Sequence, residues 1–172
     1  MNRHLARQLV IQTLYQIEVG QIPAASAMET IQLRLAELKE EATALIIKDL
    51  IDPEDFQLEK EFALDEFYFK LVNGIVDNQE KIDETIAINL TGWNFNRLNK
   101  VDRAIIRLAT YEMLYEKGTP PQVIINEALE LTKEFSETGD KKARSFNNKL
   151  LDQINQYISK SESDLVAQTT KH

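Results

Sequence analysis

The stretch KVDRAIIRLATYEMLYEKG, residues 100–118, decides the fold class. Its large apolar side chains recur every three or four residues, at Val101, Ile105, Leu108, Tyr111 and Tyr115. This spacing places them on one face of an α-helix, and a glycine such as Gly118 is typical just past a helix end. The stretch therefore predicts an amphipathic helix with one buried face.

The same helical spacing appears on both sides of this stretch. Further helices are expected over residues 3–19, 23–46, 67–76, 82–88, 120–135 and 146–158. A polar connection is expected at 51–61, which contains the helix-stop signal Asp52-Pro53. The helical pattern that begins at residue 120 ends by Gly139. No Asn-Gly, Asp-Gly or Gly-Gly pair lies between alternating apolar runs, so hairpins have no support. The predicted fold class is all-α, with a disordered tail over residues 159–172.

Composition narrows the possible chemistry. The chain has 172 residues, of which 43% are hydrophobic and 28% charged, enough for one domain or two small packed subdomains. It has no cysteine, and its two histidines, His4 and His172, lie at the ends. Thiol nucleophiles, thiolate metal sites, HExxH motifs and internal histidine triads are therefore excluded. Since phosphate-binding glycine loops and GxSxG are also absent, we expect no enzyme, no cofactor and no metal.

No run approaches the roughly 18 to 20 apolar residues of a membrane-spanning helix. The amino-terminal residues are also a poor fit to a signal peptide, because glutamines interrupt the apolar stretch that follows Arg3 and Arg7. We therefore expect a cytoplasmic protein that makes no contact with a membrane.

The negative charge is concentrated in one part of the chain. The formal net charge is −8, and residues 21–96 hold 6 Lys and Arg against 16 Asp and Glu. Residues 1–20 have 2 cations against 1 carboxylate, and residues 97–117 have 5 against 3. Because phosphate binding depends on local lysine and arginine density, a nucleic-acid site must be local or shared with a basic partner.

The first helix offers one such local site. Arg3 and Arg7 are one turn apart, His4 is beside them, and Tyr15 is two turns beyond Arg7. These residues could supply cations for phosphates and a ring for base stacking. From the residues alone, an ordinary solvated helix face with one tyrosine at its edge is the favoured explanation. The same alternatives apply to Arg103 and Arg107 in the basic segment.

Four blocks of the sequence occur in a characteristic order: ARQLVIQTLYQIEVG (6–20), FKLVNGIVDNQEKIDETI (69–86), RLNKVDRAIIRLATYEML (97–114) and PPQVIINEALELTKEF (120–135). Together they resemble the NusB family of transcription antitermination factors. The resemblance implies one all-helical domain over residues 1–158, built as two small packed subdomains at about 1–92 and 93–158, without catalytic activity. It also implies binding to the boxA element of nascent ribosomal RNA together with ribosomal protein NusE, within an RNA polymerase antitermination complex.

The resemblance also assigns roles to particular residues. The predicted RNA-binding residues are Arg3, His4, Arg7, Tyr15, Asp102 and Arg103. The predicted partner-binding residues are Lys142, Arg144 and Phe146. The sequence differs from the family pattern at Lys149, which replaces a glycine, and at the amino end, where the family carries a denser run of arginines.

Two other interpretations remain open. One is an RNA-binding module like the NusB-like domain of ribosomal RNA cytosine methyltransferases, and the other is a helical adaptor that has lost RNA binding. Because the chain ends near its last predicted helix, without a cofactor-binding domain, we expect the free-standing factor.

Overall fold

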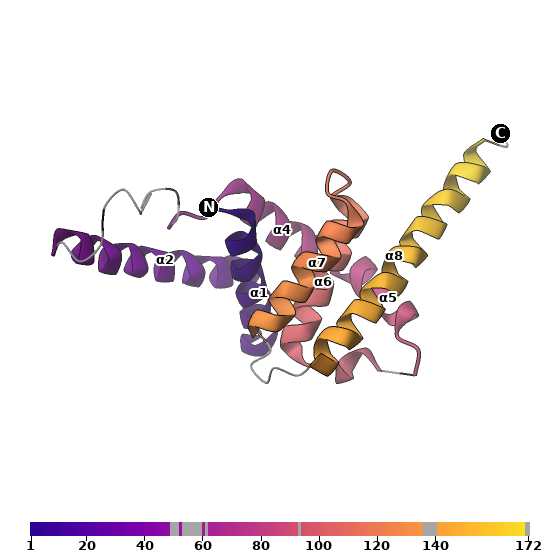
Figure 1. The fold of residues 1–172 in the computed structure, drawn as a ribbon, viewed down its shortest axis with the longest axis horizontal. Helices are drawn as coiled ribbons and strands as arrows, with labels where there is room; N and C mark the ends of the chain where they lie inside the picture. Colours follow the sequence, from indigo (N-terminus) through magenta and orange to yellow (C-terminus); the bar gives the residue numbers. More distant parts are fainter. Residues whose placement is uncertain (49–51, 53–59, 61, 93, 136–140, 171–172) are drawn as a thin grey trace. The chain divides into compact units, whose positions relative to one another are not determined.

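The computed structural model describes residues 1–48, 52, 60, 62–92, 94–135 and 141–170. Within these ranges it has seven α-helices and one short 3-10 helix (Figure 1): α1 (Arg3–Gly20), α2 (Ala24–Ile47), α4 (Glu66–Asp77), α5 (Gln79–Asn89), η2 (Phe95–Arg97), α6 (Lys100–Tyr115), α7 (Pro121–Phe135) and α8 (Lys141–Thr169). The described residues contain no β-strand, which confirms the all-α prediction. The predicted connection at 51–61, apart from residues 52 and 60, and the predicted helix end at Gly139 lie outside the described residues.

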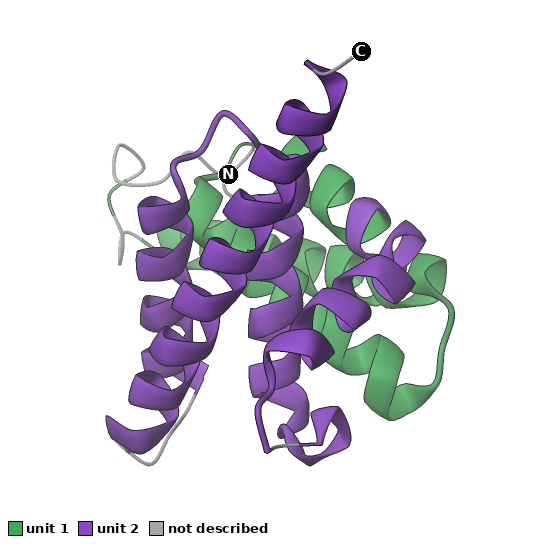
Figure 2. Ribbon diagram, turned by 90° about the vertical axis from the view of Figure 1, so that its right-hand side faces the viewer, with its two compact units in different colours: residues 1–73 green, residues 74–172 purple. Residues whose placement is uncertain are grey.

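The chain divides into two compact units, residues 1–73 and 74–172 (Figure 2). This division falls inside α4, well before the boundary expected near residue 92. The reason is the packing of α5, which contacts both α6 and α8 and therefore belongs to the second unit.

In the first unit, α1 packs against α2. The apolar stripe of α1 is buried at Leu9, Val10 and Leu14, as the spacing predicts. Thr13 is a buried polar residue on this stripe, and its Oγ1 donates to the Leu9 carbonyl at 2.7 Å and lies 2.6 Å from the hydroxyl of fully buried Tyr68. A buried hydroxyl needs such a partner, and burial raises the pKa of Tyr68 above its ordinary value.

In the second unit, α6 is the central helix. It contacts α5, α7 and α8, and its residues from Arg103 to Met113 are all buried. Its amino end is capped by Asn99, whose Oδ1 accepts from the Asp102 backbone N–H at 2.7 Å. The stretch that predicts a helix with one buried face therefore forms one that is buried all round from Arg103 to Met113, whereas Tyr115 at its end is 42% exposed.

Helix α8 corrects the prediction for the end of the chain. It continues to Thr169, so the disordered tail predicted from residue 159 is wrong up to that residue, while residues 171–172 lie outside the described ranges. The last buried side chain is Ile158, and Leu165 and Val166 are 63% and 64% exposed. Apolar spacing does not predict the helical turns from residue 159 to Thr169, because they carry no buried apolar stripe. An ion pair between Lys117 and Glu162 links them to the segment between α6 and α7.

Candidate nucleic-acid interface

At the amino end of α1, two arginines share one aromatic ring. The guanidinium carbon of Arg3 lies 4.7 Å from the centroid of the Phe67 ring, and that of Arg7 lies 5.4 Å from it. Arg3 is exposed, whereas Arg7 keeps only 4% of its surface accessible. Arg3 can therefore present its charge to a phosphate, while Arg7 is part of the packing between α1 and the start of α4.

His4 and Tyr15 complete the predicted set on α1. His4 is half-buried beside Arg3, and Tyr15 is 40% exposed. Twelve residues separate Arg3 from Tyr15, which corresponds to about 18 Å along the helix axis. One nucleotide cannot reach both side chains, so a nucleic acid that contacts both has to run along α1.

Arg103, in the second unit, is engaged by its own chain. It is 9% exposed, and its Nη2 donates to the carbonyls of Asn96 and Leu98 at 3.3 and 3.1 Å. Its guanidinium lies 5.0 Å from the centroid of Phe95, and Arg107 lies 5.3 Å from the same ring. Through these contacts Arg103, on α6, holds η2 and the residue that follows it against α6.

Arg107 has a defined structural partner. Its Nε and Nη2 donate to the two carboxylate oxygens of Asp83 on α5, at 2.8 and 2.9 Å. Two parallel charge-assisted bonds of this kind fix the orientation of the guanidinium. For Arg107, the structure therefore supports an intramolecular role, which was one of the two alternatives in the sequence.

Asp102 lies at the start of α6 in a network of amides. Its carboxylate accepts from Asn99 Nδ2 at 2.7 Å and from Asn147 Nδ2 at 3.3 Å, and Asn147 also donates to Thr132 Oγ1 at 3.1 Å. Burial raises the pKa of Asp102, although the hydrogen bonds from the Asn147 and Asn99 side chains lower it in part. The network ties α6, α7 and α8 together.

Sequence reasoning missed Asn147, which is only 1% exposed. One signal could have identified it. Asn147 lies three and four residues before Leu150 and Leu151, which places an amide on the apolar stripe of the last helix. A polar side chain on such a stripe needs buried partners.

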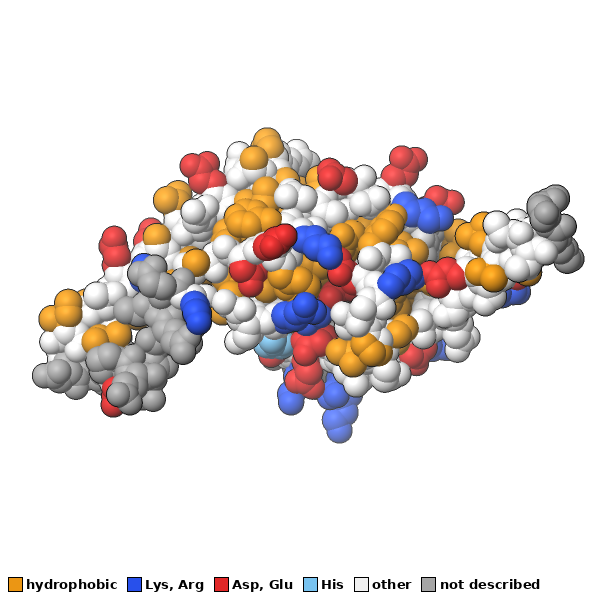
Figure 3. All heavy atoms as spheres, turned by 90° about the horizontal axis from the view of Figure 1, so that it is seen from above, with side chains coloured by type: hydrophobic (Ala, Val, Ile, Leu, Met, Phe, Trp, Pro, Cys, Tyr) orange, Lys and Arg blue, Asp and Glu red, His pale blue; other side chains and the backbone are white. Residues whose placement is uncertain are grey.

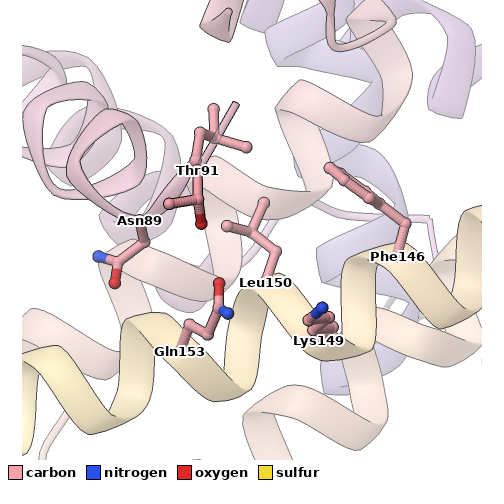
Figure 4. A pocket seen from close by; sticks show the side chains of 7 residues that line it. Asn89, Thr91, Phe146, Lys149, Leu150 and Gln153 are labelled. Carbon is pink, nitrogen blue, oxygen red and sulfur yellow. The ribbon is translucent and has the colours of Figure 1, made fainter. Parts of the chain in front are cut away.

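The first turns of α8 carry cations and border a cavity of about 160 Å³. Lys142, Arg144 and Lys149 are exposed, and Phe146 is half-buried. The cavity lies between α8 and the end of α5 (Figure 4), and it is lined by Asn89, Leu90, Thr91, Phe146, Lys149, Leu150 and Gln153. The predicted partner-binding residue Phe146 is thus part of a recess with mixed apolar and polar walls.

Three further observations concern surface charge, metal binding and membrane-spanning helices. On the face drawn in Figure 3, lysine and arginine side chains lie among acidic and apolar ones. In the part of the chain that the structure describes, no cluster of three His, Asp or Glu residues could hold a metal ion. Within the same residues, no helix has the length and apolar character needed to cross a membrane.

Comparison with known proteins assigns the family. The sequence model of the NusB family matches residues 4–156. The transcription antitermination protein NusB of Geobacillus kaustophilus is 36% identical over 160 residues, which cover 93% of this chain and 100% of that protein. The corresponding protein of Bacillus subtilis is 37% identical over 161 residues, covering 94% of this chain and 100% of that protein. The chain belongs to the NusB family.

Solved structures agree on the fold. A structure of T. maritima NusB superposes with a TM-score of 0.66 at 30% identity, covering 91% of this chain and 92% of that one. A structure of the antitermination factors NusB and NusE in complex with double-stranded RNA gives a TM-score of 0.62 at 22% identity, covering 91% and 99%. At this low sequence identity, the second similarity supports the fold alone.

Proposed function

We propose that this protein is a transcription antitermination factor that binds the boxA element of nascent ribosomal RNA together with ribosomal protein NusE. The observation that carries the proposal is its membership of the NusB family over residues 4–156, with full-length antitermination relatives at 36–37% identity. In this role the protein acts in the cytoplasm within the RNA polymerase antitermination complex, without catalysing a reaction.

We assign the main RNA contacts to α1. Exposed Arg3, supported by the Phe67 ring, provides a cation for a phosphate, and Tyr15 provides an accessible ring for a base. His4 lies between them in the sequence and is half-buried. Buried Arg7 acts by holding this end of α1 on Phe67.

The predicted pair at the start of α6 has a supporting role in this proposal. Arg103 holds η2, and Asp102 organises the amides of Asn99 and Asn147. Both side chains thereby fix the amino end of α6. Among the three predicted partner-binding residues, Lys142 and Arg144 are exposed and Phe146 is half-buried.

The charge distribution explains why a second protein is needed. Residues 1–73 carry 7 Lys and Arg against 13 Asp and Glu, and residues 74–172 carry 13 against 15. Neither unit has an overall positive field to attract RNA, so only local contacts contribute. A basic partner bound beside those contacts extends the positive surface, and RNA affinity then rises by linkage.

The test is a titration of labelled boxA RNA and a scrambled RNA with the full chain, at two salt concentrations, with and without NusE. We expect weak, salt-dependent binding by the chain alone and markedly tighter, boxA-selective binding with NusE. The variant Arg3→Gln should weaken binding and reduce the salt slope by about 0.7, the value for one phosphate contact on a single strand.

The matched control is Arg34→Gln, which removes an equal charge from an exposed arginine of α2 that is paired with Glu37. It should leave RNA affinity near the wild-type value. Equal affinity for boxA and scrambled RNA in the presence of NusE would contradict the proposed function.

A further inference from the structure

One face of α8 combines cations with an aromatic ring. Lys142, Phe146, Lys149 and Gln153 are separated by four, three and four residues, so they lie along a single face of the helix. This face runs beside the buried stripe that includes Leu150 and Ile154. In Figure 4, Phe146, Lys149 and Gln153 line one side of the cavity, with Asn89 and Thr91 across from them.

The cavity has the walls that a single nucleobase requires. Leu90 and Leu150, which are both buried, give it an apolar lining, and the half-buried ring of Phe146 adds a flat surface. The amide of Gln153 and the hydroxyl of Thr91 can each donate and accept hydrogen bonds at a base edge. Its volume, about 160 Å³, is below the usual range for sites of drug-sized ligands and suits one small ring system.

The charge on this part of α8 favours an anionic ligand. Residues 141–151 contain four Lys and Arg and no Asp or Glu. Three of them, Lys141, Lys142 and Arg144, occupy the first turn of the helix, where the helix macrodipole is positive and favours negative charge. This end of α8 therefore attracts an anionic ligand more than a basic protein partner.

We propose that this face of α8 binds one nucleotide of single-stranded RNA, with the base in the cavity against Phe146 and the neighbouring phosphates on Lys142 and Lys149. The seven-residue separation of the two lysines corresponds to about 10 Å along the helix. The proposal rests on the proposed RNA-binding function and adds a contact separate from those on α1. It transfers Lys142 and Phe146 from the predicted partner-binding set to RNA binding.

The experiment measures boxA RNA binding by the full chain with NusE for three variants. Lys149→Gln removes one proposed phosphate contact from an exposed position and should reduce the salt slope by about 0.7. Phe146→Leu keeps an apolar side chain and removes the ring, and should weaken binding on the order of 5- to 100-fold. Lys160→Gln, an exposed lysine of the same helix away from the cavity, is the charge-matched control and should bind like wild type.

A scan with abasic nucleotides identifies the bound base. For the wild type, one abasic position should cost as much affinity as the Phe146→Leu change. For Phe146→Leu the same abasic position should cost little more, because the stacking contact is already lost. Thermal melting of Phe146→Leu checks that the fold is retained, and the exposed Lys149→Gln variant tests the site independently.

The possible outcomes separate this proposal from the proposed function. If wild-type protein binds boxA RNA and Arg3→Gln weakens it, while Lys149→Gln and Phe146→Leu match Lys160→Gln, the nucleotide site on α8 is overturned and the RNA-binding function stands. If wild-type protein shows no boxA binding with NusE, both are overturned.

Discussion

At the scale of single residues, Gly74 sets how closely the end of α4 approaches α6. A Cβ atom added at Gly74 would lie 2.2 Å from the hydroxyl oxygen of Tyr111 and 2.4 Å from the ring carbon that bears it. Tyr111 is itself buried, so the ring has little room to move. The absence of a side chain at residue 74 is therefore a packing requirement rather than a turn signal.

Gly74→Ala should lower the free energy of unfolding by about 1 to 3 kcal/mol through overpacking, even though alanine favours the helix. Chemical denaturation of both proteins gives the difference. Gly118→Ala is the control, since no heavy atom lies within 4 Å of a Cβ there, and it should cause no loss. A fully stable Gly74→Ala protein would mean that Tyr111 can move aside.

Asp102 gives a prediction for pH. Burial raises its pKa above the ordinary value of 3.8, so in the pH range between that value and the raised pKa the folded state binds more protons than the unfolded state. This carboxyl group therefore makes the free energy of unfolding fall as pH rises through that range and then level off. Asp102→Asn should remove this fall, as measured by denaturant titrations from pH 3.5 to 7. An identical pH dependence in the two proteins would contradict the assignment.

The site residues show what a sequence can predict at this scale. The presence of Arg3, Arg7 and Tyr15 on α1 follows from helical spacing, which a single segment determines. That Phe67 covers Arg7 depends on a contact with another helix some sixty residues away, which no local pattern encodes. Asn147 is similar, because its role becomes visible only when Asp102 and Thr132 are placed beside it.

At the scale of helices, periodicity succeeds wherever an apolar stripe is buried. The stripes of α1, α6 and α7 predict those helices to within a few residues. The three-residue η2 is too short to show a period, and the final turns of α8 have no stripe because their apolar side chains are exposed. The helical spacing of apolar residues therefore predicts which helices have a buried face, and it misses helical turns that are exposed.

Leu108 on α6 and Leu165 on α8 make a matched test of this view. Leu108 is 1% exposed, and Leu108→Ala should cost about 2 to 5 kcal/mol because it leaves a cavity in the core of the second unit. Leu165 is 63% exposed, so Leu165→Ala should stay within about 0.5 kcal/mol of wild type. Denaturant midpoints at constant m-value provide the comparison. Equal costs at the two positions would contradict the burial pattern.

At the scale of the whole molecule, the boundary between the two compact units depends on contacts that no single segment encodes. The resemblance implies two helical subdomains, and the structure divides into two units. The division at residue 73 depends on α5 contacting α6 and α8, which are later in the chain. The contacts of α5 with α6 and α8 assign it to the second unit, and the sequence of α5 alone does not predict them.

The shared-site proposal makes a prediction about the complete assembly. If NusE tightens boxA RNA binding by some factor, boxA RNA must tighten NusE binding by the same factor, because coupling free energies are reciprocal. Two titrations measure this: RNA affinity with and without saturating NusE, and NusE affinity with and without saturating RNA. Independent binding, with both factors equal to one, would show that the two ligands do not share a surface on this protein.

The enclosure of α6 has a consequence for how the second unit exchanges its amide protons with heavy water. Neighbouring helices cover this helix, and eleven consecutive residues, from Arg103 to Met113, are buried. Deuterium can then reach those amides only when the unit opens as a whole, so their exchange rates report the free energy of global opening. The exposed final turns of α8, by contrast, should take up deuterium through local fraying, long before the centre of the same unit does.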